Sequence, residues 1–136
     1  LAPDKAPNLV SGHALFQQSC ASCHGMTGNG RGPDAAKLAT PPIAFTDAER
    51  AYCMSRKFPP QHFAARFAAK EAVGKALGIG MTRWHEAEVI RGRGAPTAIL
   101  TGRCLRRASD LGVVEVLLSL THSRGMAAAV AVLRGA

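Results

Sequence analysis

The spacing of apolar residues predicts a chain built from helices. In several stretches, apolar side chains recur every three or four positions, which is the period of an α-helix. The helices are expected at residues 9–19, 46–58, 61–77, 83–91 and 110–120, with a further short one at 34–38. No convincing pair of alternating runs indicates paired strands. The pattern therefore predicts an all-α fold of about four to five helices joined by long loops.

Three of these helices have distinctive sequences. Thr46 and Glu49 have the spacing of a capping box at the start of the second helix, which should stop before Pro59. The helix at 61–77 is amphipathic. One face holds Phe63, Phe67, Val73 and Leu77, and the basic residues Arg66, Lys70 and Lys75 are expected to point away. The helix at 110–120 is almost wholly apolar, so it should be buried.

The length of 136 residues is typical of one domain. We expect an extended segment at residues 1–8, the domain at 9–122 and a C-terminal tail at 123–136. Loops as long as those predicted are unusual in a compact domain unless they wrap something. Aromatic residues make up only 5% of the chain. The core should therefore be aliphatic, unless another group supplies a large flat apolar body.

The net charge of +8 is concentrated in the middle of the chain. Residues 50–110 alone carry twelve basic and four acidic side chains, which also sum to +8. Such a region either steers an acidic partner toward the protein or is a solvated surface. Nucleic-acid binding is not indicated, because no recognised motif accompanies the basic residues. No apolar run reaches the roughly 20 residues of a membrane-spanning helix.

The sequence Cys-Ala-Ser-Cys-His at residues 20–24 matches the attachment signature of c-type haem. Cys20 and Cys23 can reach the two vinyl groups of one porphyrin, and His24 then lies beneath it, where its imidazole can ligate iron. A redox dithiol would need a βαβ surrounding, and a zinc site would need a second ligand pair. Neither is present. A disulfide across two residues would be strained, and it would leave His24 unexplained.

Residues 12–38 around this motif resemble the N-terminal part of class I monohaem c-type cytochromes. The shared features are Gly and Phe four residues apart before the motif, the Gly-rich run that ends at Pro33, and the later Pro-Pro and Phe-Thr-Asp segments. The resemblance covers about residues 12–50 and fades beyond. It implies a cytochrome c-like domain wrapped round one haem, with Gly12 and Phe16 at a helix crossing. It also implies that the Pro33 carbonyl accepts the ring N–H of His24.

The resemblance further implies a methionine on the opposite face of the haem. Met81 lies in a Gly-rich loop between two predicted helices, where family members place this ligand, although no proline follows it here. The alternative use of Met81 is to fill a gap in the core. His85 and His62 are rival ligands, and an open site is the remaining possibility. Cys53 and Cys104 either pair with one another or are buried thiols.

The residues and the resemblance together predict a single-haem electron carrier whose covalently bound haem c cycles between ferric and ferrous iron. The alternatives are a haem domain or subunit of a larger membrane redox or transport complex, and a ligand-binding haem sensor. No nucleophile–base pair is apparent, so no enzyme activity of its own is expected. A redox protein, acidic or membrane-bound, is the expected partner. Because haem of this class is attached outside the cytoplasm, we expect a periplasmic location after removal of a signal peptide.

Overall fold

The computed structural model describes residues 9–26, 30–39, 44–81, 83–91, 94–123 and 125–136. The chain divides into two compact units, Leu1–Ala44 (the first unit) and Phe45–Ala136 (the second unit). The extended segment expected at residues 1–8 lies outside the described residues. The domain boundaries expected after residues 8 and 122 stay predictions.

The first unit contains helix α1 (Leu9–Ser19), the short helix α2 (Ala21–His24) and the 3₁₀ turn η1 (Ala35–Lys37). The helix expected at residues 9–19 is confirmed. The chain after α2 folds back over it: the Gly32 N–H donates to the Cys23 carbonyl at 3.1 Å, and the Asp34 N–H donates to the Ser22 carbonyl at 2.8 Å. A Cβ atom at Gly32 would overlap the Ser22 carbonyl, so this close return of the chain requires glycine.

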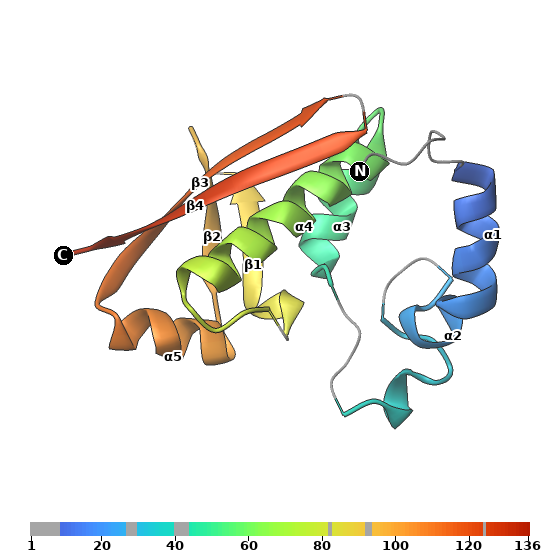
Figure 1. Cartoon of the computed structure of the whole chain (residues 1–136), viewed down its shortest axis with the longest axis horizontal. Coiled ribbons are helices and arrows are strands. Elements are labelled where there is room, and N and C mark those ends of the chain that lie inside the picture. The colour runs from blue at the N-terminus through green and yellow to red at the C-terminus, as the bar shows by residue number, and fades with distance from the viewer. Residues whose placement is uncertain (1–8, 27–29, 40–43, 82, 92–93, 124) are drawn as a thin grey trace, which may run out of the picture. The chain divides into compact units, whose positions relative to one another are not determined.

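The second unit combines helices with one antiparallel sheet (Figure 1). Its helices are α3 (Asp47–Met54), α4 (Pro59–Ala76), the 3₁₀ turn η2 (Trp84–Glu86) and α5 (Gly102–Asp110). Its strands are β1 (Ala87–Arg91), β2 (Pro96–Leu100), β3 (Val113–Ser123) and β4 (Met126–Gly135). The strands lie in the order β1-β2-β3-β4, and each pairs antiparallel with the next. Helix α4 packs against β1, β3 and β4.

The capping box predicted for α3 is confirmed. The Glu49 N–H donates to Thr46 Oγ1 at 3.2 Å, and the Thr46 N–H donates to Glu49 Oε2 at 2.9 Å. The helix expected at 61–77 is confirmed as α4, which begins at Pro59, a position that suits proline because the first turn has no partner for its N–H. Val73 and Leu77 are fully buried, as their spacing predicts, whereas Phe67 of the same predicted face is 44% exposed.

The prediction of an all-α fold is wrong. The run expected to be a helix at 110–120 is mostly strand β3, the helix expected at 83–91 is η2 followed by β1, and the expected loop after residue 91 contains β2. In β3, Val116 and Leu118 are buried while Leu117 between them is 41% exposed. Burial thus alternates with the period of two that defines a strand. The β-branched valines of this run also favour a strand.

The core of the second unit is made by α4, β1, β3 and α5. Its buried members are Ala69, Val73, Leu77, Ala87, Val89, Cys104, Ala108, Val116 and Leu118. Met81 packs against this cluster and lies 4.0 Å from Cys104, measured between the two sulfur atoms. Cys53 and Cys104 are buried free thiols, so the alternative in which they pair is not the one found.

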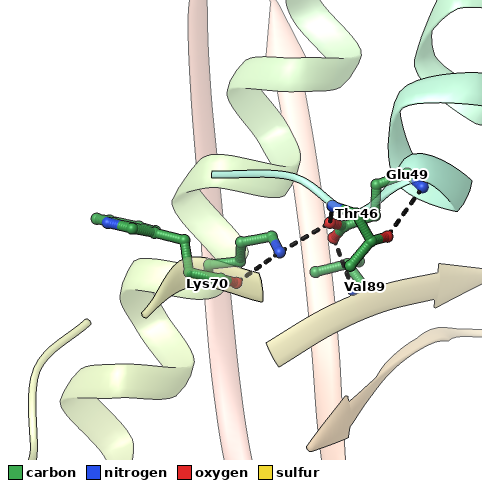
Figure 2. Close-up of polar contacts among 5 residues, drawn as sticks. Thr46, Glu49, Lys70 and Val89 are labelled. Carbon is green, nitrogen blue, oxygen red and sulfur yellow. Dashed lines mark hydrogen bonds and ion pairs between the residues drawn. The ribbon is translucent and has the colours of Figure 1, made fainter. Parts of the chain in front are cut away.

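An ion pair is buried beside this core. Lys70 Nζ lies 2.8 Å from Glu49 Oε2, and neither side chain is more than 1% exposed (Figure 2). Lys70 also donates to the Trp84 carbonyl at 2.8 Å, and the Val89 N–H donates to Glu49 Oε1 at 2.8 Å. The expectation that Lys70 and Arg66 point to solvent is therefore wrong, since Arg66 is only 7% exposed. This network ties α3, α4, η2 and β1 together.

Candidate anion-binding site

A cavity of about 250 Å³ opens in the second unit where α3, α4, β1 and β3 meet. Its charged and aromatic lining consists of Tyr52, His62, Arg66, Arg91 and His122. His62 and Arg66 are four residues apart on α4 and therefore share a face. His122 follows Leu118 and Leu120 at alternate positions of β3, which places it on the sheet face that packs against α4.

Aromatic and cationic side chains contact one another in this cavity. The rings of His62 and His122 meet edge to face, with their centroids 5.2 Å apart. The Tyr52 ring lies edge-on to His62 at 6.1 Å. The guanidinium carbons of Arg66 and Arg56 lie 3.9 and 4.2 Å from the centre of the Tyr52 ring. Stacking of this kind holds a guanidinium group in place without neutralising its charge.

The lining of the cavity is strongly positive. Arg66 and Arg91 contribute guanidinium groups, and no carboxylate of the described residues lines this cavity. Two acidic residues, Glu49 and Glu88, line a smaller cavity of about 140 Å³ that shares the Tyr52, Arg66 and Arg91 walls. Glu49 is already bound to Lys70 and to the Val89 N–H. The lining of the larger cavity therefore has two guanidinium groups and no carboxylate, while Glu88 lines the adjoining smaller cavity.

Arg66 is suited to binding an anion. Its side chain is nine-tenths buried, and its Nε atom has no hydrogen-bond partner within the described residues. A buried donor without a partner is costly, so it gains most from a ligand that accepts its hydrogen bond. Guanidinium groups bind phosphate and carboxylate through two parallel hydrogen bonds. The cavity is therefore a candidate site for a phosphorylated or carboxylated ligand.

Partial burial lowers the pKa of His62 below its usual value of 6.5, and the nearby charges of His122, Arg56 and Arg66 lower it further. Burial also raises the pKa of the Cys53 thiol, with Arg66 opposing the shift. Both shifts favour the uncharged form of the group, because burial removes water from a charged imidazolium or thiolate. Nearby cations disfavour the imidazolium further. His62 is thus biased toward the neutral form while the cavity is empty.

The five residues predicted to bind haem lie in different units. Cys20, Cys23, His24 and Pro33 belong to the first unit, and Met81 belongs to the second. Cys20 is exposed, and His24 is the last residue of α2. Nothing in this placement tests their individual roles as ligands. Among the residues that the structure describes, no three His, Cys, Asp or Glu side chains are grouped so that they could hold a metal ion.

The sequence interpretation missed the cavity itself. It treated His62 as a surface residue or a rival iron ligand, and it placed Arg66 toward solvent. Reading residues 113–122 as a strand would have put His122 on the same face as Leu118 and Leu120. The four-residue spacing of His62 and Arg66 was also visible. Neither signal shows that α4 and β3 lie side by side.

Comparison with known proteins identifies the relatives of this chain. Residues 33–130 match the family described as the 4'-phosphopantetheinyl transferase superfamily. A relative named holo-[acyl-carrier-protein] synthase, from Moorella thermoacetica, is 52% identical over 90 residues, which cover 64% of this chain and 70% of the relative.

Two solved structures of similarly named proteins have the same fold. The Helicobacter pylori holo-[acyl-carrier-protein] synthase, solved in complex with coenzyme A, has a TM-score of 0.60 at 21% identity and covers 90% of this chain and 93% of its own. The Mycobacterium tuberculosis acyl carrier protein synthase has a TM-score of 0.54 at 37% identity and covers 76% and 89%.

These similarities overturn the cytochrome interpretation. The resemblance to c-type cytochromes, the haem cofactor and electron transfer with both of its haem-based alternatives are wrong, because the family model and the relatives are those of a transferase. The expectation that the chain is not an enzyme is wrong for the same reason. The periplasmic location was inferred from haem attachment and is overturned with it. The family match begins at Pro33, so it does not include Cys20, Cys23 or His24.

The expectation about membrane-spanning segments can be compared with the helices of the structure. None of the helices in the described parts of the chain combines the length and the apolarity that a bilayer crossing needs, in agreement with the expectation of no membrane-spanning segment.

Proposed function

The chain belongs to the 4'-phosphopantetheinyl transferase superfamily, and from this premise we propose that it transfers the 4'-phosphopantetheine group of coenzyme A to an acyl carrier protein. The donor is suggested by the coenzyme A complex of a relative with the same fold. The acceptor is suggested by the names of relatives up to 52% identical. The observation in this chain that supports the proposal is the cationic cavity around Arg66.

The chemistry of the donor explains why such a cavity is needed. Coenzyme A joins phosphopantetheine to a nucleotide through a pyrophosphate, and the nucleotide carries a further phosphate on its ribose. Transfer breaks the pyrophosphate bond, so the acceptor oxygen gains the phosphopantetheine phosphorus and the nucleotide leaves as adenosine 3',5'-bisphosphate. Both the substrate and this leaving group carry several negative charges. Fixed cations that bind them supply orientation and electrostatic stabilisation, the main requirements of phosphoryl transfer.

The size of the cavity indicates which part of coenzyme A it would hold. Its volume is about 250 Å³. Sites that enclose a whole drug-sized ligand usually measure roughly 300 Å³ or more. The cavity would therefore bind a fragment, such as one phosphate with part of its ribose. In this arrangement Arg66 and Arg91 bind phosphate oxygens, and the Tyr52 ring orients Arg66. The rest of the substrate would extend outside.

Mass spectrometry tests the proposal directly. The purified chain is incubated with coenzyme A and an unmodified acyl carrier protein, with Mg²⁺ in the buffer because divalent cations commonly neutralise phosphate charge in such reactions. The carrier protein should gain the mass of one phosphopantetheine group, and adenosine 3',5'-bisphosphate should appear in equal amount. A carrier protein that keeps its original mass would contradict the proposal.

Two arginine variants test the role of the cavity. We expect Arg91→Gln to raise the KM for coenzyme A by about tenfold or more, the usual loss for a hydrogen bond to a charged group. Arg66→Lys keeps the positive charge but loses the planar guanidinium group and its parallel N–H donors, so it should also weaken the binding of coenzyme A. Arg134→Gln is the matched control, because Arg134 lies on β4 in a partly exposed ion pair with Glu115. Unchanged kinetics in both cavity variants would place the coenzyme A site elsewhere.

A further inference from the structure

The cavity contains a feature that phosphate binding alone does not require, namely two imidazole rings in contact. His62 comes from α4 and His122 from β3, with ring centroids 5.2 Å apart and an interplanar angle of 71°. A single guanidinium group can bind a phosphate without the two imidazole rings. A histidine pair differs from arginine because its charge changes between about pH 5 and pH 8.

The groups around His62 favour its neutral form while the cavity is empty. Arg56 follows α3, Arg66 is one turn further along α4, and Arg91 ends β1. The remaining neighbours are His122 on β3 and the Tyr52 phenol on α3. The charged neighbours that shift the pKa of this ring are thus cationic, and the carboxylates of Glu49 and Glu88 line the adjoining smaller cavity instead. Two protonated rings in contact among three guanidinium groups would repel one another.

A bound phosphate reverses this balance. Its negative charge offsets the guanidinium groups and favours the imidazolium form of any ring beside it. If His62 is neutral in the empty cavity and protonated in the filled one, then binding must take up a proton from solution. By linkage, a ligand that draws a proton into its site binds more tightly as the pH falls.

We propose that His62 couples phosphate binding to proton uptake, so that this cavity binds the phosphate of coenzyme A together with a proton that His62 takes up. The inference rests on the proposed function for the identity of the ligand, but it concerns a property of the cavity that any phosphate-like dianion should reveal. His62 acts as a positioning and charge-matching residue. It carries out no chemical step of the transfer.

Calorimetry on the full chain measures this coupling. Coenzyme A is titrated in two buffers of different ionisation enthalpy, which gives the number of protons taken up per ligand bound, from about pH 5.5 to about pH 8 across the histidine range. We expect net uptake in the wild type and an affinity that rises by up to about tenfold per pH unit where His62 changes charge. The His62→Gln variant should lose part of the uptake and flatten the pH profile.

The controls separate this coupling from a structural role and from titration of the ligand. Coenzyme A has a phosphate that titrates near pH 6, so its own proton exchange is separated from that of the protein by repeating the titration with sulfate, which keeps its charge in this range. His13→Gln removes an exposed histidine of α1 and should match the wild type. If His62→Gln weakens binding equally at every pH, with unchanged proton uptake, the proposal is overturned.

A second probe keeps the inference separate from the proposed function. Inorganic sulfate keeps its charge throughout this range, and the His62 ring can be followed by NMR during its titration. We expect sulfate or coenzyme A to raise the pKa of His62, and the absence of a rise with both ligands would overturn the inference. Transfer to the carrier protein without any His62-linked uptake would refute the inference alone. Proton-linked binding without transfer would refute the proposed function alone.

Discussion

The two units of this chain differ in what specifies them. The first unit carries the most distinctive sequence motif but little apolar burial: its described residues include Val10, Leu15 and Met26, which are 62% exposed or more. The second unit carries no motif of comparable clarity, yet it contains the whole buried cluster around Val73 and Leu77. The family match covers all but the last few residues of the second unit and only the end of the first. A short motif in a poorly buried segment is thus a weaker guide to a chain than the family match of its packed part.

The sharpest test of this difference compares one lysine ion pair from each unit. Lys70 and Glu49 are buried in the second unit, and Lys37 and Asp34 form an exposed pair in the first. Lys70→Met leaves a buried carboxylate without its cation, so we expect a loss of about 3–5 kcal/mol in the free energy of unfolding. Lys37→Met should cost less than about 0.5 kcal/mol. Urea denaturation followed by circular dichroism measures both, and equal losses would contradict the contrast.

Apolar truncation should separate the units almost as strongly. Leu77 is fully buried. Leu77→Ala should therefore cost about 2–5 kcal/mol through lost burial and the cavity left behind. Leu15 on α1 is 62% exposed. Leu15→Ala should accordingly change the stability by no more than about 0.5 kcal/mol. Thermal unfolding of both variants gives the comparison, and a large loss from Leu15→Ala would show that the first unit is held by packing after all.

A smaller effect is expected at the start of the second unit. Thr46→Ala removes the acceptor for the Glu49 N–H. It should destabilise the chain by about 1 kcal/mol. Thr46→Ser keeps the hydroxyl and serves as the control, with a loss well below that of alanine. The same denaturation experiment measures both, and if serine and alanine are equally destabilising, the hydroxyl does not contribute through the cap.

The smallest effect is a pH dependence of stability that arises from His62 in the second unit. The fold lowers the pKa of His62, so near pH 6.5 the folded chain binds fewer protons than the unfolded chain. The contribution of His62 to stability is therefore complete above that pH and is lost as the pH falls below it. His62→Gln should remove this part of the pH dependence, whereas His13→Gln on α1 should keep it. Identical stability–pH profiles for the wild type and His62→Gln would exclude it.

The sequence predicted the local parts of the fold and missed the sheet. The helix at 9–19, the capping box at Thr46 and the existence of helix α4 follow from interactions within a few residues, which periodicity and capping rules describe. Strand β3 does not. Its partners Val130 and Val132 are on β4, beyond a turn. A continuous apolar run fits a buried helix as well as a strand until pairing decides.

The candidate site was missed for the same reason. On a helical wheel of α4, Arg66 looks solvent-facing. The wheel does not show Tyr52 and His122, which line the same cavity and come from α3 and β3. The buried pair of Lys70 and Glu49 is 21 positions apart in sequence and likewise depends on how α3 and α4 pack. The misleading motif at Cys20–His24 was local, so it was fully visible, but it lies outside the region that matches the family.

By itself, the sequence determined which segments form α1, α3 and α4 and where α3 begins, because hydrogen bonds and side-chain contacts within a few residues set these features. The tertiary structure alone decided that residues 113–123 are a strand, that Lys70 and Arg66 are buried, and that His62 meets His122. Those outcomes depend on pairing and packing between segments far apart in the chain, and their free energy is gained only when both segments are in place.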